Sequence, residues 1–132
     1  MANILVVDDE VDVGEVVRRV LERAGYAVMV AQSAPAALEA VSRQAPDVVI
    51  TDVIMPKMHG VDLIKILRQR YPRVRVIAIS GGGSFGPLAY KPEAISTHAY
   101  LAAAREAGAE EFLTKPFDLT DLIAAVRRLL PN

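Results

Sequence analysis

Residues 4–10 read Ile4-Leu5-Val6-Val7-Asp8-Asp9-Glu10, four aliphatic side chains followed at once by three acids. The pattern returns at Val48-Val49-Ile50-Thr51-Asp52, where a second apolar run ends on a carboxylate. Continuous runs of β-branched residues are typical of strands buried on both faces of a parallel sheet. Each stretch therefore predicts a buried strand with acidic residues at its carboxyl end.

Further segments repeat this alternation along the chain. Apolar runs that predict strands lie at residues 28–31, 74–79 and, more weakly, 111–114. Apolar side chains at 3- and 4-residue spacing predict helices around residues 13–21, 37–41, 63–67 and 122–130. Asp118, with Asp121 three positions later, predicts a capped start for the last helix. Alternating strands and helices build a parallel α/β sheet with helices on both faces and right-handed crossovers.

Composition narrows the class of protein. The 132 residues suit a single domain, and 52% hydrophobic with 23% charged residues is the balance of a soluble globular protein. A net charge of −1 gives no electrostatic case for direct nucleic-acid or membrane binding. The absence of cysteine excludes disulfides and thiolate chemistry. No basic leader segment and no long apolar run is present, so we expect a cytoplasmic protein.

Polar residues follow the predicted strands at one edge of the sheet, where open parallel sheets bind ligands. They are Asp8-Asp9-Glu10, Asp52, Ser80 and Lys115. Crowded carboxylates repel one another, and a hard divalent cation relieves that repulsion. An Asp can attack phosphorus to form an acyl phosphate, while a cation, an ammonium and a hydroxyl stabilise the phosphoryl oxygens. The edge therefore predicts phosphoryl chemistry on an aspartate.

Taken together, these motifs resemble the receiver domain of bacterial two-component response regulators. The matching pieces are Asp8-Asp9-Glu10, Thr51-Asp52-Val53-Ile54-Met55-Pro56, Gly60, Ser80, Gly108-Ala109, Phe112 and Lys115-Pro116-Phe117. The resemblance covers essentially residues 1–132 and implies a flavodoxin-like (βα)5 three-layer sandwich. Its five-stranded parallel sheet has the order 2-1-3-4-5.

The resemblance also assigns roles to individual residues. Asp52 matches the phosphoacceptor, and Ser80 and Lys115 match the hydroxyl and ammonium that contact the phosphoryl group. The Mg²⁺ ligands implied, with Mn²⁺ as an alternative ion, are Asp9, Asp52 and the main-chain carbonyl of Ile54, with Asp8 acting through metal-bound water. Ser80 and Phe112 match the switch positions, and the Lys115-Pro116 bond resembles the family's cis peptide.

The implied function is signalling rather than enzymatic turnover, apart from self-catalysed phosphorylation and slow autodephosphorylation. A sensor histidine kinase or histidine phosphotransfer protein would donate the phosphoryl group. A downstream protein would bind the face made by the fourth helix, fifth strand and fifth helix, and the chain would be a monomer or a weak phosphorylation-dependent dimer. At 132 residues it would either act alone or be excised from a longer regulator.

Three departures from the family pattern are visible. Ser80 replaces the commoner Thr, Phe112 replaces the commoner Tyr, and the connection between Ser80 and Lys115 is roughly a dozen residues longer than usual. The extra length is expected in a loop at about 81–92, whose Phe85, Leu88 and Tyr90 would either tuck against the domain or be re-presented on phosphorylation.

Taken one at a time, these polar residues could also have ordinary structural roles. Asp8 and Asp9 could simply cap a helix, and Asp52, Ser80 and Lys115 could each be an ordinary loop residue. A haloacid-dehalogenase-type phosphohydrolase would need an acid two positions after the nucleophile, where this chain has Ile54. A flavodoxin-like electron carrier would place phosphate beside Asp8-Asp9-Glu10, which would repel it. A degenerate receiver is disfavoured because every chemical residue is present.

Overall fold

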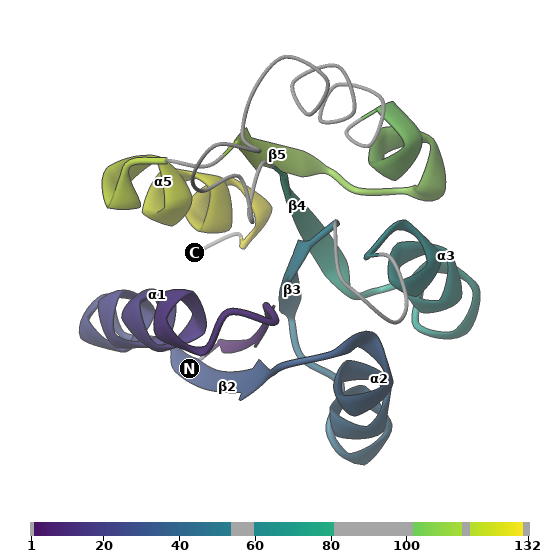
Figure 1. Cartoon of the computed structure of the whole chain (residues 1–132), viewed down its shortest axis with the longest axis horizontal. Helices are drawn as coiled ribbons and strands as arrows, with labels where there is room; N and C mark the ends of the chain where they lie inside the picture. Colours follow the sequence, from purple (N-terminus) through teal and green to yellow (C-terminus); the bar gives the residue numbers. More distant parts are fainter. Residues whose placement is uncertain (1, 54–59, 81–101, 115–116, 131–132) are drawn as a thin grey trace.

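A five-stranded parallel sheet forms the centre of the molecule, with helices packed on both of its faces (Figure 1). The structure is a computed structural model and describes residues 2–53, 60–80, 102–114 and 117–130. The strand order β2-β1-β3-β4-β5 confirms the predicted topology. The strands are β1 (Asn3–Val7), β2 (Ala27–Ala31), β3 (Val48–Asp52), β4 (Arg75–Ser80) and β5 (Glu111–Thr114).

The helices divide between the two faces of the sheet. Their bounds are α1 (Val11–Arg23), α2 (Ala34–Arg43), α3 (Gly60–Arg70) and α5 (Leu119–Leu129), and residues 102–107 are also helical. In Figure 1, α1 and α5 lie on one side of the sheet, and α2, α3 and helix 102–107 lie on the other. Within the described ranges, no helix combines the length and apolar character that crossing a bilayer requires.

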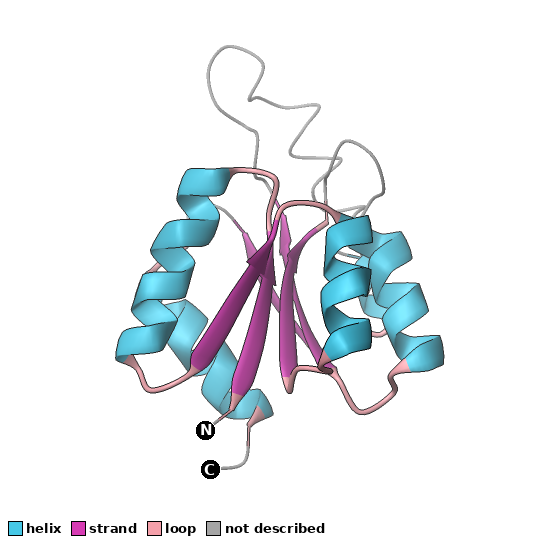
Figure 2. Ribbon diagram, turned by 90° about the horizontal axis from the view of Figure 1, so that it is seen from below, coloured by secondary structure: helices cyan, strands magenta, loops and turns pink. Residues whose placement is uncertain are grey.

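Two separate apolar clusters fill the spaces between sheet and helices. Alternate residues of each strand point to opposite faces, so Val49 packs with α2 and α3 while Ile50 packs with α1 and α5. The three inner strands are almost completely buried, as the continuous apolar runs predict. This double burial provides most of the hydrophobic stabilisation of the sheet. Figure 2 shows the strands running side by side between the two helical layers.

Burial on both faces was predicted for all the strands, and for β2 and β5 this prediction is wrong. Residues of both strands are mainly half-buried, and Met29 in β2 is 37% exposed. The reason is their position, because β2 and β5 are the edges of the sheet. An apolar run identifies a strand but does not say whether a neighbour lies on each side of it.

The predicted start of the last helix is right in position and wrong in mechanism. Asp118 is the N-cap residue of α5, but its side chain makes no capping hydrogen bond to the described residues. Its backbone carbonyl accepts the first helical bond, from the Leu122 N–H at 3.1 Å. In contrast, the Ser33 hydroxyl caps α2 by accepting a bond from the Ala36 N–H at 3.2 Å.

Several predicted features lie outside the described residues. They are the lengthened connection at about 81–92, the Ile54 carbonyl, Lys115, and the cis peptide before Pro116. A single domain over residues 1–132 also stays a prediction.

Gly60 begins α3 in direct contact with the end of β3. The Gly60 N–H donates to the Val53 carbonyl at 3.1 Å. A Cβ at position 60 would lie 2.2 Å from the Asp52 carbonyl oxygen and 2.7 Å from the Val53 Cα. The Asp52 carbonyl also accepts a bond from the Thr51 hydroxyl at 2.9 Å. A glycine at this position therefore lets α3 pack against the backbone that carries Asp52.

We expect Gly60→Ala to lower the free energy of unfolding by about 1–3 kcal/mol, because backbone atoms cannot move aside as a flexible side chain can. Gly14→Ala is the matched control, since a Cβ there meets only the Val30 Cγ1 at 3.0 Å and gains helix propensity. Urea unfolding of both variants measures the difference. Equal stability of the two variants would show that the contact at Asp52 does not restrict position 60.

Candidate functional site

The register of the sheet brings acids from two distant parts of the sequence together. Strands β1 and β3 are neighbours, and Val7 is paired with Thr51. Asp8 and Asp52 are the next residues along these two strands, so they emerge side by side at the carboxyl edge. Both lie at the end of a fully buried apolar run, which fixes their backbones.

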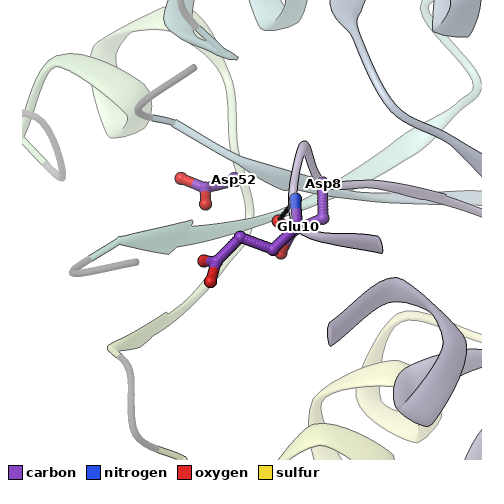
Figure 3. Close-up of side chains that lie close together, drawn as sticks. All are labelled: Asp8, Glu10 and Asp52. Carbon is purple, nitrogen blue, oxygen red and sulfur yellow. Dashed lines mark hydrogen bonds between the residues drawn. The ribbon is translucent and has the colours of Figure 1, made fainter. Parts of the chain in front are cut away.

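Three carboxylates meet at this edge. Asp8, Glu10 and Asp52 each offer a carboxylate oxygen, and these atoms all lie within 4.8 Å of one another. Figure 3 shows the three side chains grouped where β1 and β3 end. Asp8 is 3% exposed and Asp52 1%, while Glu10 is half-buried. We call these three residues the acidic cluster.

Asp8 also shapes the turn that leads into α1. Its backbone N–H donates to the Ala31 carbonyl at 3.0 Å, and its Oδ1 accepts a bond from the Glu10 N–H at 2.9 Å. The N-cap residue of α1 is Glu10, whose side chain makes no capping hydrogen bond to the described residues. The Asp8 carboxylate therefore accepts its hydrogen bond from the N–H of Glu10, the residue directly before α1. Its carboxylate orders the turn and at the same time belongs to the acidic cluster.

The acidic cluster contains Glu10 and not Asp9, and the assignment of Asp9 as a metal ligand stays a prediction. Asp9, predicted as a direct metal ligand, is exposed and lies outside the acidic cluster. Glu10 was counted among the acids at the strand end but was not assigned as a ligand. The sequence feature that pointed to Glu10 is the run of three consecutive acids. The backbone turn within this run decides which of the three side chains face Asp52.

Ser80 ends β4 beside the central strand. Asp52 is paired with Ile79, so Ser80 is the next residue along the strand neighbouring the candidate phosphoacceptor. Ser80 is fully buried, and its Oγ has no hydrogen-bond partner in the part of the chain that the structure describes. A buried hydroxyl without a partner is costly, so its presence at this edge indicates a role beyond packing.

Phe112 lies on β5, opposite Ala78 of β4. Its ring is half-buried against the cluster that includes α3 and helix 102–107. The guanidinium of Arg105 lies over this ring, 5.1 Å from the ring centroid.

The acidic cluster fits a hard divalent cation. Its donors are all carboxylate oxygens, and Mg²⁺ prefers oxygen ligands and usually keeps several positions for water or phosphate. Ser80 ends the neighbouring strand, so the edge brings carboxylates and a hydroxyl together.

Comparison with known proteins identifies the family. The model of the response regulator receiver domain matches residues 4–127. The response regulator MprA of Mycobacterium leprae (strain TN) is 34% identical over 127 residues, which are 96% of this chain and 50% of that protein. The DNA-binding transcriptional regulator NtrC of Rhizobium meliloti (strain 1021) is 33% identical over 129 residues, covering 98% of this chain and 24% of that protein. The chain thus spans half or less of the length of these relatives.

Similar solved structures support the same family assignment. The receiver domain of NtrX from Brucella abortus superposes with a TM-score of 0.81 at 31% identity, covering 96% of this chain and 97% of that one. The chemotaxis protein CheY4 of Vibrio cholerae gives a TM-score of 0.82 at 28% identity, covering 98% and 99%. With the sheet order and the acids at its carboxyl edge, these matches show that the chain belongs to the response regulator receiver domains of two-component signalling systems.

Proposed function

We propose that Asp52 accepts a phosphoryl group from a phosphohistidine of a sensor histidine kinase or a histidine phosphotransfer protein. The observation that carries this proposal is the buried Asp52 carboxylate at the end of the central strand, grouped with Asp8 and Glu10 within 4.8 Å. Burial fixes the position of the carboxylate at the carboxyl edge of the sheet, where ligands of such folds bind.

In the proposed reaction, an oxygen of the Asp52 carboxylate attacks phosphorus and a P–O bond forms. The P–N bond to the donor imidazole breaks, and its electron pair stays on that nitrogen. The buried Ser80 hydroxyl would donate a hydrogen bond to a phosphoryl oxygen, and Lys115 would place its ammonium beside another.

Mg²⁺ or Mn²⁺ would be held by Asp52, Asp9 and the Ile54 carbonyl, with Asp8 acting through a bound water. Bound there, the ion would offset negative charge on the phosphoryl oxygens. Glu10 joins this set as a candidate because its carboxylate lies with those of Asp8 and Asp52.

Phosphorylation would alter the affinity for a downstream protein. Ser80 ends β4 opposite Thr114 of β5, so a change at Ser80 reaches β5 directly. From there it reaches the face formed by helix 102–107, β5 and α5. The relatives MprA and NtrC are at least about twice as long as the matched region, and the target of this receiver would be either an attached domain or a separate protein.

The phosphoacceptor prediction is tested with acetyl phosphate and Mg²⁺. We expect the intact mass of the wild-type protein to rise by one phosphoryl group, and Asp52→Asn to remain unmodified because an amide is a poor nucleophile. Asp12→Asn is the matched control, since Asp12 is an exposed acid on α1 away from the cluster. An unchanged wild-type mass would favour a degenerate receiver, and a mass gain in Asp52→Asn would place the phosphoryl group elsewhere.

The metal prediction is tested by thermal unfolding with and without Mg²⁺. A ligand at 100 times its dissociation constant stabilises the folded state by about 2.7 kcal/mol, so we expect a clear upward shift of Tm in the wild type. Asp9→Asn and Asp52→Asn should lose most of that shift, whereas Asp12→Asn should keep it.

The same thermal-unfolding measurements show whether Asp9 or a member of the acidic cluster ligates the metal. Without metal, Asp8→Asn and Glu10→Gln should each match or exceed the wild-type Tm, because like charges within 4.8 Å repel one another. A full Mg²⁺ shift in Asp9→Asn together with its loss in Glu10→Gln would replace Asp9 by Glu10 as the ligand.

A further inference from the structure

A contact between Arg105 and Phe112 joins helix 102–107 to β5. The Arg105 guanidinium carbon lies 5.1 Å from the centroid of the Phe112 ring, within the range of a cation–π interaction. Arg105 is exposed and Phe112 is half-buried. The arginine therefore covers the ring from the solvent side.

The neighbours of Phe112 on strand β4 are small residues. Phe112 is paired with Ala78, and Thr114 with Ser80, so the side chains at these four positions project from the same face of the sheet. Ala78 carries only a methyl group, and the Ser80 hydroxyl is buried without a partner among the described residues. Phe112 thus contacts the Arg105 cation and lies on the same face of the sheet as the small side chains of Ala78 and Ser80.

The backbone that carries Arg105 is firmly held. The N–H groups of Gly108 and Ala109 both donate to the Ala104 carbonyl, at 3.1 and 3.0 Å, and end the helix. Gly108 has a φ of +122° and packs against the Arg68 side chain, where a Cβ would lie 2.5 Å from Cγ. Movement of the ring away from the arginine therefore requires Phe112 to move while the helix end stays in place.

Two acids near Phe112, Glu110 and Glu111, bind other groups. Glu110 accepts bonds from the Val76 N–H at 2.9 Å and from Arg68 and Arg75 at 3.2 and 3.0 Å. Glu111 accepts two bonds from Arg128 on α5, which raise the pKa of that guanidinium. The guanidinium of Arg105 contacts the ring of Phe112 instead.

We propose that Arg105 is a positioning residue that holds the Phe112 ring in the position it has here and thereby opposes phosphorylation of Asp52. The proposal rests on the function proposed above, in which Ser80 turns toward a phosphoryl group. The resemblance gives Phe112 a switch position beside Ser80, and a shift of its ring toward Ser80 would break the contact with Arg105. The contact consequently favours the unphosphorylated form.

The size of the effect follows from the interaction. An exposed cation–π pair changes an equilibrium by a factor of about two to five. We expect Arg105→Ala to bind the phosphoryl mimic beryllofluoride, with Mg²⁺ present, about two to five times more tightly than wild type. Arg105→Lys should bind with intermediate affinity, because an ammonium retains part of the attraction to the ring.

The direction of the change in beryllofluoride affinity distinguishes this proposal from a general effect of removing positive charge. Beryllofluoride is anionic, so the loss of any nearby positive charge should weaken its binding. Arg127→Ala is the matched control, because Arg127 is an exposed arginine on α5. Tighter binding by Arg105→Ala with unchanged or weaker binding by Arg127→Ala supports the proposal. Equal or weaker binding by Arg105→Ala overturns it.

A double-mutant cycle tests whether the effect passes through the ring. In a Phe112→Leu background, Arg105→Ala should no longer change the affinity, because no aromatic ring remains. If Phe112→Leu does not fold, the aromatic NMR resonances of Phe112 in Arg105→Ala replace the cycle. Without ligand they should shift toward their positions in the wild-type beryllofluoride complex, and unchanged resonances would contradict the proposal.

The two proposals fail differently. A wild-type protein that neither gains a phosphoryl group nor binds beryllofluoride would overturn the proposed function and this inference with it. A wild type that does both, with Arg105→Ala indistinguishable from Arg127→Ala, would overturn only the role of Arg105.

Discussion

The pairing of β1 with β3 is the constraint on which the rest of the site depends. Because Val7 lies opposite Thr51, the next residues, Asp8 and Asp52, leave the two strands next to each other. The residues before them are buried on both faces of the sheet, so neither strand can slip without exposing its core side chains. Hydrophobic packing on the two faces thus fixes the spacing of two charged groups at the edge.

This arrangement has a cost in stability. Carboxylates that are almost fully buried and within 4.8 Å of a third acid are unfavourable in an isolated fold. Ser80 adds a buried hydroxyl without a partner among the described residues. A fold that places such groups together at one edge indicates selection for binding rather than for stability. The proposed cation would offset the negative charge of the acids, and the proposed phosphoryl group would offer an acceptor to the Ser80 hydroxyl.

Sequence patterns were sufficient for the fold and only partly for the site. The apolar runs located β1, β3 and β4 within about one or two residues, because double burial leaves a continuous signal. The same rule failed for β2, where Met29 is exposed, since a run of apolar residues does not record whether a strand lies at an edge. The sequence did not group Glu10 with Asp52, because the turn after β1, held by the Asp8 carboxylate, decides which acids face Asp52. The contact of Arg105 with Phe112 joins a helix to a strand, and neither residue alone has a pattern that predicts it.

The central claim is that the buried edge formed by β1, β3 and β4 receives a phosphoryl group on Asp52. A crystal structure of the protein with Mg²⁺ and beryllofluoride tests it most directly. The account predicts beryllium bonded to a carboxylate oxygen of Asp52, the Ser80 hydroxyl within hydrogen-bond distance of a fluorine, and the metal ligated by acids of the Asp8-Asp9-Glu10 turn. A structure with Asp52 unmodified, or with the fluoride complex and the metal bound away from this edge, would contradict it.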